Sequence, residues 1–376
     1  MDSHILSELT TPAAVVELSR LKSNTEWMSN HAHQLGVALR PHVKTHKCIE
    51  AARYQVADHF GGIAVSTLAE AEHFADAGFV DITYAVPLAP GRASRVALLN
   101  QKISLLRVLV DHEIAVLALS EAMASTEGRI EVLVKVDCGY GRAGLKPADP
   151  NLIGLAQLIE AQDQLDFVGV LAHAGHAYDC ESVEAIKAIA EKERSETVDA
   201  AERIRAHGIP VRVVSVGSTP TACHVQDLSG VTELRPGNYA FFDVFQAQIG
   251  SCSTADVALS VLSEVIGVYP DRNTVLIDAG ALALSKDPGA THVAENEGFG
   301  VVCDLDLRPI TGLSLVGLSQ EHGKLLVEEG VGSTLRVGDR LRILPNHSCL
   351  VTALHESLQV VETGALVGEW RPVRGW

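Results

Sequence analysis

No apolar run in the 376-residue sequence approaches the roughly 20 residues that a membrane-spanning helix needs. The first residues, Met1 to His4, include no basic region, and no signal-type apolar run follows them. The seven cysteines are scattered without a CxxC pair, a pattern typical of reduced thiols and an intracellular protein. Basic residues are also scarce, and the formal net charge is −17. We therefore expect a cytoplasmic protein that binds neither nucleic acid nor an anionic membrane.

The length of the chain exceeds what one ordinary hydrophobic core holds, so two domains are expected. Apolar residues make up 47% and charged residues 20% of the sequence, which is typical of a folded protein. No internal repeat and no low-complexity linker divides the chain. The division must therefore be found from a change in the pattern of predicted elements.

Short apolar strands alternate with helical patterns through the first two thirds of the sequence. After a first strand at 11–18, we predict strands at 37–42, 63–65, 82–85, 105–110, 130–136, 167–172, 211–216 and 231–235. Helices are predicted at 20–34, 48–57, 67–77, 92–100, 113–125, 150–162 and 181–206, and 219–229 is either a short helix or a loop. Eight strands alternating with helices predict an α/β fold, a (β/α)₈ barrel of the TIM type. An open doubly wound sheet is the alternative, although no G-x-G-x-x-G follows the first strand.

One of these helices carries its own boundary signals. The sequence from Thr67 to Glu70 has the form of a capping box, and Gly78 has the place of a helix-ending glycine.

The pattern changes after about residue 250, where strands follow one another with little helix between them. They are predicted at 257–268, 274–278, 298–303, 314–318, 325–329, 340–344 and 358–362. We therefore expect a barrel at 18–248 and a C-terminal, mostly-β domain at 249–376, joined by the N-terminal strand in 1–17.

The segment from Arg40 to Lys47, Arg-Pro-His-Val-Lys-Thr-His-Lys, lies at a junction between a predicted strand and a helix. Two lysines, two histidines and an arginine raise the local positive charge, which should lower the pKa of a lysine among them. A lysine that is partly neutral near pH 7 can form a Schiff base with a carbonyl compound. A solvated basic loop or an anion-binding patch is the alternative interpretation.

Other polar residues follow the predicted strands at the end where a barrel places its active site and often binds phosphate. They lie in loops that begin with His42 and Lys44, and then at 137–144, 173–178, 217–221 and 235–239. Each loop alone could be an ordinary turn or a structural histidine. Together they predict one rim with a reactive lysine and a phosphate cradle, which is what pyridoxal phosphate requires.

His347 and Cys349 are two residues apart in Pro-Asn-His-Ser-Cys. In an extended segment both side chains would project to the same side. Imidazole and thiolate suit Zn²⁺, and two protein ligands leave positions open for water or substrate. A buried cysteine beside a histidine in a turn is the alternative.

The stretch around Lys44 resembles the cofactor-lysine motif of the D-serine dehydratase and D-threonine aldolase family, whose members are pyridoxal-phosphate enzymes of the alanine racemase fold. The resemblance continues in order through the loops above, Asp278–Gly280, Glu321–Gly323 and His347–Cys349, and so covers nearly the whole chain. It implies that Lys44 is the catalytic Schiff-base lysine and that His347 and Cys349 are catalytic metal ligands. It implies cofactor contacts at His42, Arg142, His173, Tyr178, Gly217, Ser218, Thr219, Gly237, Asn238 and Tyr239.

Aldolases of this family tend to have His-Cys-Asp where this chain has His347-Ser348-Cys349, the dehydratase-like form. The resemblance therefore implies a lyase that takes D-serine to pyruvate and ammonia, or D-threo-3-hydroxyaspartate to oxaloacetate and ammonia. It further implies Zn²⁺, or another divalent metal such as Mn²⁺ or Co²⁺, and a homodimer with the active site at its interface. A metal-activated D-threonine-type aldolase, an amino-acid racemase and a non-catalytic pyridoxal-phosphate carrier are the alternatives.

Overall fold

The computed structural model describes residues 4–293, 298–328 and 334–376. The chain forms two compact units. The barrel unit comprises Glu26–Lys44, Ala52–Gly237 and Val373–Trp376, and the β-rich unit comprises Met1–Thr25, Thr45–Ala51 and Asn238–Pro372. The predicted domains, 18–248 and 249–376, are regions expected to fold independently, and their bounds stay a prediction.

The barrel unit contains eight parallel strands in the order β2-β9-β8-β7-β6-β5-β4-β3, as the alternating pattern predicts. The strands are β2 (Ala38–Leu39), β3 (Ile63–Val65), β4 (Asp81–Pro87), β5 (Leu105–Val110), β6 (Ile130–Lys135), β7 (Leu165–Leu171), β8 (Val213–Val216) and β9 (Glu233–Leu234). Between the two end strands, an isolated bridge joins His42 to Ala64. The sheet therefore curls into the predicted (β/α)₈ barrel of the alanine racemase type.

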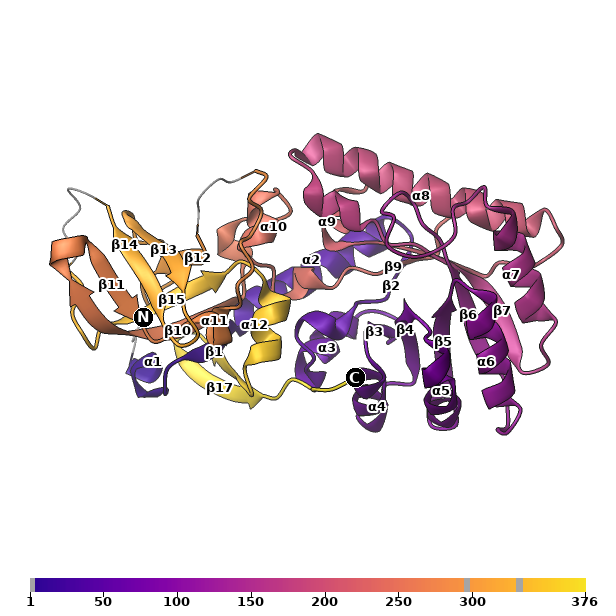
Figure 1. The fold of residues 1–376 in the computed structure, drawn as a ribbon, viewed down its shortest axis with the longest axis horizontal. Coiled ribbons are helices and arrows are strands. Elements are labelled where there is room, and N and C mark those ends of the chain that lie inside the picture. Colours follow the sequence, from indigo (N-terminus) through magenta and orange to yellow (C-terminus); the bar gives the residue numbers. More distant parts are fainter. Residues whose placement is uncertain (1–3, 294–297, 329–333) are drawn as a thin grey trace. The chain divides into compact units, whose positions relative to one another are not determined.

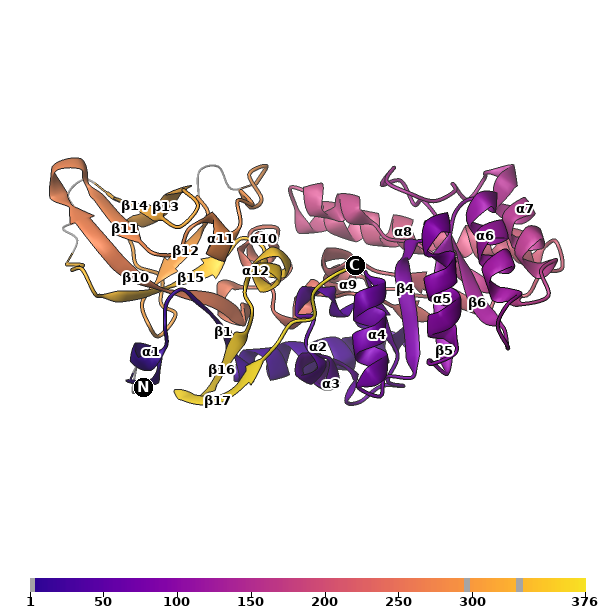
Figure 2. The same ribbon diagram turned by 60° about the horizontal axis from the view of Figure 1, so that its bottom comes forward.

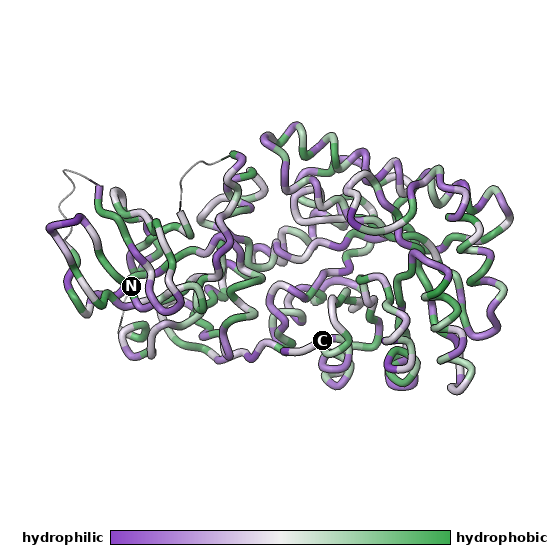
Figure 3. Tube along the Cα trace, viewed as in Figure 1, coloured by the Kyte–Doolittle hydropathy of each residue, from purple (hydrophilic) through white to green (hydrophobic). Residues whose placement is uncertain are grey.

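Helices lie on the outside of these strands, as Figures 1 and 2 show for α4 to α7. The helices are α2 (Leu18–Gln34), α3 (Ile49–Val56), α4 (Leu68–Asp76), α5 (Ala93–Asn100), α6 (Glu113–Met123), α7 (Pro150–Glu160), α8 (Val183–Arg205) and α9 (Thr219–His224). Strands β5, β6 and β7 are buried along almost their whole length, because helices cover one face and the barrel interior the other. Figure 3 shows hydrophobic residues gathered along these strands.

Short sequence signals set several helix boundaries. Thr67 caps α4 by accepting the backbone N–H of Glu70, and Gly78 follows the helix with φ +92°, both as predicted. The reciprocal half of the capping box is different, because the Glu70 carboxylate accepts the backbone N–H of Ser66 at 2.7 Å. The ambiguous segment after β8 forms the short helix α9.

The β-rich unit is built on a nine-stranded sheet in which β1 pairs with β10 and β16. Its strands are β1 (Ala13–Glu17), β10 (Leu259–Tyr269), β11 (Thr274–Ile277), β12 (Gly300–Cys303), β13 (Leu313–Leu318), β14 (Gly323–Val327), β15 (Arg340–Pro345), β16 (Leu358–Glu362) and β17 (Ala365–Trp370). Helices α1 (His4–Glu8), α10 (Val244–Gln248), α11 (Ala281–Leu284) and α12 (Ser348–Leu354) accompany them. Side chains such as Val261, Ile277 and Ile343 are fully buried in its core. Strand β17 was missing from the prediction, because three of its first residues are exposed and its apolar signal is short.

In the described part of the chain, no helix combines the length and apolar character that a bilayer crossing demands.

The Arg40 side chain follows the end strand β2 and hydrogen bonds to residues of β9, β3 and β4. It is 1% exposed; Nε donates to Glu233 at the start of β9 (2.8 Å), and Nη1 donates to Asp81 at the start of β4 (2.7 Å). The same Nη1 donates to the carbonyl of Ile63, where β3 begins, at 3.3 Å. Burial alone would raise the pKa of Glu233, but the Arg40 charge holds it below its usual range. Arg40 is therefore a structural cation, and its pairing with Glu233 and Asp81 reduces its share of the positive charge that the sequence predicts around Lys44.

Replacing Arg40 by methionine should lower the free energy of unfolding by about 3–5 kcal/mol, because it leaves the buried carboxylate of Glu233 without its paired cation. Urea denaturation measures this. Arg212→Met is the matched control, since its side chain is 54% exposed and pairs with Asp166 at 2.6 Å. The control should cost no more than about 1 kcal/mol. An equally small loss for Arg40→Met would contradict the role of this side chain in barrel closure.

Candidate active site

Lys44 lies in a single 3₁₀ turn, Val43–Thr45, directly after the strand that begins the barrel. The backbone N–H of Lys44 donates to Nδ1 of His42 at 3.4 Å, and Nε2 of His42 lies 3.3 Å from the Ser66 hydroxyl. The His42 N–H in turn donates to the carbonyl of Pro236. His42 thus fixes the backbone at Lys44 through contacts on both sides of the barrel closure.

The other two basic residues of the segment belong to the β-rich unit. His46 is buried, accepts the backbone N–H of Cys48 at 3.0 Å and meets the Phe241 ring edge-on. Lys47 has φ +54°, the left-handed region in which residues other than glycine are uncommon. His46 and Lys47 shape a turn. Much of the high density of basic residues in this segment therefore has a structural cause.

Cations do surround the site in the barrel unit, but they come from different strands. Burial lowers the pKa of His173 well below its usual value, and the charges of Lys44, Lys135, Arg142 and Arg235 lower it further. His173 is therefore neutral at pH 7. Its Nδ1–H donates to the carbonyl of Gly217 at 3.3 Å, which leaves Nε2 unprotonated.

Two members of this cation group were not predicted to contact the cofactor, although Arg235 begins the loop 235–239 that the sequence places on the rim. Lys135 ends β6 and is 5% exposed; burial and then the charge of Arg235 lower its pKa to about 8. Arg235 follows β9, and burial lowers its pKa to about 10 although its Nε donates to the Ser215 hydroxyl. A lysine within the apolar run Val132-Leu133-Val134-Lys135-Val136 was a signal that sequence reasoning could have used.

The loop after β6 packs on the loop after β7 through one aromatic ring. A Cβ atom on Gly175 would lie 2.2 Å from the Tyr140 ring, so this close approach requires glycine. The Tyr140 ring meets His173 edge-on, and the guanidinium of Arg142 lies 5.0 Å from the centre of that ring. Tyr178 lies in the 3₁₀ turn Gly175–Asp179 of the loop after β7. The predicted residues after β6 and β7 therefore share one rim of the barrel.

Two backbone N–H groups of the predicted phosphate cradle already donate to side chains within the barrel unit. The N–H of Gly217 donates to Glu193 at 3.0 Å, and the N–H of Ser218 donates to the Thr221 hydroxyl at 2.9 Å. Gly237 lies against His42, since a Cβ there would be 2.7 Å from the His42 carbonyl oxygen. Phosphate contacts by Gly217, Ser218, Thr219 and Gly237 remain a prediction, and at Gly217 the backbone N–H is already committed.

Asn238 and Tyr239, the other two predicted phosphate contacts, belong to the β-rich unit and are buried there. The Asn238 amide nitrogen donates to Asp243 at 2.6 Å and to the Ser348 hydroxyl at 3.2 Å. Asp243 also accepts the backbone N–H of Ser348 at 3.0 Å. These bonds orient the segment that carries the predicted metal ligands, so a phosphate contact at Asn238 would have to use its backbone.

His347 and Cys349 lie together, but not in the extended segment that the sequence suggested. His347 is the residue before α12, and Cys349 is in the first turn of that helix. The two side chains nevertheless hydrogen bond to each other, because the helix turns Cys349 back towards His347. The Sγ of Cys349 also lies 3.2 Å from the hydroxyl of Thr45, the residue that follows Lys44 in the chain.

Asp287 holds the His347 ring from the other side, with its Oδ2 2.8 Å from Nδ1. This carboxylate leaves Nε2 as the ring nitrogen available for a metal, the arrangement found around histidine ligands. Burial alone would lower the pKa of His347, but Asp287, then Cys349 and Asp243, raise it to about 11. A metal would have to displace the proton from Nε2, and the acidic groups around the ring would then stabilise the bound cation.

Across residues 4–293, 298–328 and 334–376, no three histidine, cysteine or acidic side chains converge in a closed metal site. His347 and Cys349 offer two donor atoms, and a metal held by two protein ligands leaves positions for water or substrate.

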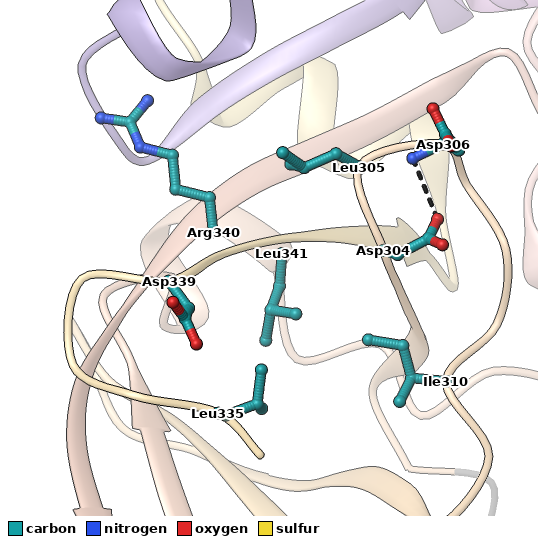
Figure 4. Close-up of a pocket in the computed structure, with 8 residues that line it drawn as sticks. All are labelled: Asp304, Leu305, Asp306, Ile310, Leu335, Asp339, Arg340 and Leu341. Carbon is teal, nitrogen blue, oxygen red and sulfur yellow. Dashed lines mark hydrogen bonds between the residues drawn. The ribbon is translucent and has the colours of Figure 1, made fainter. Parts of the chain in front are cut away.

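A separate pocket of about 470 Å³ lies in the β-rich unit (Figure 4). It is lined by Asp304, Leu305, Asp306, Ile310, Leu335, Asp339, Arg340 and Leu341. Asp304 accepts the backbone N–H groups of Asp306 and Arg308, and Asp339 accepts that of Arg336. These carboxylates stabilise their own turns, and none of the predicted site residues lines the pocket.

Comparison with known proteins identifies relatives along the whole chain. Residues 16–244 match the sequence family described as alanine racemase, N-terminal domain, and residues 258–361 match a serine dehydratase domain. The D-threo-3-hydroxyaspartate dehydratase of Delftia sp. (strain HT23) is 41% identical over 99% of each chain. The D-serine dehydratase of Dictyostelium discoideum is 35% identical over 99% of this chain and 98% of its own. The D-threonine aldolase of Arthrobacter sp. is 30% identical over 97% of this chain and 92% of its own.

The solved structure of the Delftia dehydratase has a TM-score of 0.95 with this chain and covers 99% of both chains. A cysteine-to-alanine variant of that dehydratase, solved in a metal-free form, also has a TM-score of 0.95, at 40% identity over 99% of both chains.

Asp287→Asn should weaken zinc binding roughly 10- to 100-fold, because the ring of His347 loses the carboxylate that orients it. Competition with a chromogenic chelator measures the zinc affinity directly, without reference to activity. Asp271→Asn, an exposed aspartate of the same unit, is the control and should keep the parent affinity. Equal zinc affinities for the two variants would show that Asp287 does not support the site.

Proposed function

The chain belongs to the D-serine dehydratase and D-threonine aldolase family, with its alanine racemase N-terminal domain, and we propose that it is a dehydratase of D-3-hydroxyamino acids that uses pyridoxal phosphate and zinc. Its products would be a 2-oxo acid and ammonia. D-Serine would give pyruvate, and D-threo-3-hydroxyaspartate would give oxaloacetate.

The pairing of His347 with Cys349 across Ser348, with Asp287 behind the histidine, is the observation that carries this proposal. This is the dehydratase-like form of the segment, and it provides two ligands with open positions rather than a closed structural site. The dehydratases of Delftia and Dictyostelium, at 41% and 35% identity, support the same choice.

When bound, pyridoxal phosphate withdraws electrons from the Cα of an attached amino acid, and zinc polarises the bond to the departing hydroxyl. Lys44 would hold the cofactor covalently through Nζ, and Nζ, once released, is the natural base for the Cα proton. His42 and the short turn Val43–Thr45 fix the backbone from which this side chain extends. Neutral His173 would place an aromatic ring beside the cofactor without adding a further positive charge.

On the β-rich side, His347 Nε2 and Cys349 Sγ would bind the metal. With a metal on Nε2, Asp287 would keep the remaining proton of His347 on Nδ1; Asp243 holds the backbone of Ser348 between the two ligands. Asn238 supports the same segment through Asp243 and the Ser348 hydroxyl. The chain thus offers two ligand atoms and a rigid frame, and leaves the remaining coordination positions to the substrate and water.

The proposal includes a homodimer with active sites at the interface, as in the family that the sequence resembles. Light scattering on the purified protein should give twice the 40.0 kDa mass of the chain.

Lys44→Ala should abolish the visible absorbance of covalently bound cofactor, because no other amine would take the place of Nζ. The absorption spectrum after incubation with pyridoxal phosphate and gel filtration measures this. Lys47→Ala is the matched control and should keep the band. A band that survives in Lys44→Ala and disappears in Lys47→Ala would transfer the assignment to Lys47.

His347→Ala and Cys349→Ala should each retain the bound cofactor and lower the rate of ammonia release at least roughly 100-fold, because the hydroxyl loses its Lewis acid. The buried Cys303→Ala on β12 is the control and should keep the rate. Full activity in either ligand variant would remove the metal from the proposal.

One experiment separates the proposed dehydratase from its alternatives. D-Serine, D-threonine and the 3-hydroxyaspartates are assayed for ammonia, with and without a chelator. Ammonia that appears with a 2-oxo acid, and disappears with the chelator, is the expected result. Glycine and an aldehyde without ammonia would identify an aldolase, and inversion at Cα that resists the chelator would identify a racemase. No turnover of any of these amino acids would favour a non-catalytic carrier.

A further inference from the structure

Glu193 is a buried carboxylate on the inner side of helix α8. It is 2% exposed, whereas its neighbours Glu191 and Glu196 pair at the surface with Arg194 and Lys192. Helix α8 packs against β7, β8 and α9, and Figure 1 shows it beside α9. Glu193 therefore faces the ends of two strands that carry predicted cofactor residues.

Both carboxylate oxygens of Glu193 accept hydrogen bonds from these loops. Oε1 accepts the backbone N–H of Ala174 at 2.8 Å and that of Gly217 at 3.0 Å. Oε2 accepts the Thr221 hydroxyl at 2.9 Å. One side chain on α8 thus joins the loop after β7 to the loop after β8.

These bonds determine the backbone conformation at Gly217. Its N–H points to Glu193, and its carbonyl accepts the Nδ1–H of His173. The Thr221 hydroxyl, held by Glu193, accepts the backbone N–H of Ser218 and lies 3.0 Å from the Ser218 hydroxyl. Because the Thr221 proton goes to Glu193, the Ser218 hydroxyl donates to Thr221 here. Glu193 therefore sets the position of the Ser218 hydroxyl, which would turn from Thr221 to a bound phosphate.

The negative charge of Glu193 is also compatible with burial, because two cations lie nearby. Burial lowers the pKa of Lys135 to about 8 and that of Arg235 to about 10, and Glu193 acts on both in the opposite direction. A buried carboxylate with three hydrogen bonds and two cations nearby is compatible with a folded interior.

We propose that Glu193 is a positioning residue for the cofactor phosphate, because its carboxylate fixes the Gly217 peptide and, through Thr221, Ser218. This rests on the proposed function, since it assumes that the loop after β8 receives the phosphate of pyridoxal phosphate. Glu193 itself does not touch the cofactor in this scheme. Its effect should therefore appear in the part of the affinity that depends on the phosphate.

The test compares the affinity for pyridoxal phosphate with that for pyridoxal, which lacks the phosphate, by absorbance titration of the full-length protein. In Glu193→Ala, the affinity for pyridoxal phosphate should fall roughly 10- to 100-fold and that for pyridoxal by less than about threefold. Glu193→Gln should return both affinities to within about threefold of the parent, because its amide oxygen can still accept both backbone N–H groups and its amide nitrogen can donate to the Thr221 hydroxyl. Glu196→Ala, on the exposed side of the same helix, is the control.

A merely structural role would lower both affinities alike and would not be rescued by glutamine. Either result, or parent-like affinities in Glu193→Ala, would overturn the proposal. If Glu193→Ala does not fold, Thr221→Val tests the same link, and it should lower the affinity for pyridoxal phosphate alone by roughly tenfold. An unchanged ratio in Thr221→Val would also overturn the proposal. A parent protein that binds neither compound would instead refute the proposed function.

Discussion

The ion pairs of Arg40 are the constraint on which the geometry of the barrel unit depends. Strand β2 contributes only Ala38 and Leu39 to the sheet, too few for backbone hydrogen bonds alone to hold the end of a barrel firmly. The guanidinium of Arg40 adds bonds to Glu233 and Asp81 directly after this strand. Lys44 follows four residues later. The position of the proposed catalytic amine is therefore set by a cation that itself has no chemical role.

The two units create opposite electrostatic environments at their candidate residues. In the barrel unit, burial and then the charges of Lys44, Lys135, Arg142 and Arg235 lower the pKa of His173 and keep it neutral. Such a group of cations suits a phosphate and the carboxylate of an amino acid. Because a carboxylate among so many cations is well compensated, the barrel can also bury Glu193 as a structural anchor.

In the β-rich unit the balance is reversed, because acidic groups surround one imidazole. Asp287, Cys349 and Asp243 raise the pKa of His347 to about 11 against the effect of burial. Excess negative charge around a nitrogen and a sulfur ligand suits a divalent cation. Each environment suits one requirement of the proposed dehydratase reaction: an anchored anion on the cofactor in the barrel unit, and a Lewis acid for the hydroxyl in the β-rich unit.

Periodicity in the sequence determined the alternation of strands and helices, most of their boundaries and the presence of a β-rich region, because strand and helix patterns are local. It predicted a barrel but left an open sheet as the alternative. Motif spacing also singled out Lys44, His347 and Cys349, since each lies in a short segment of unusual composition. Only the tertiary structure decided that Arg40 is a buried ion-pair partner, that Cys349 faces His347 from a helix, and that Glu193 and Lys135 are buried next to predicted site residues. The reason is physical: burial and hydrogen bonding depend on side chains that are distant in sequence, such as Arg40 and Glu233 or Glu193 and Gly217. No local sequence pattern indicates those contacts, because they form only when the sheet closes into a barrel.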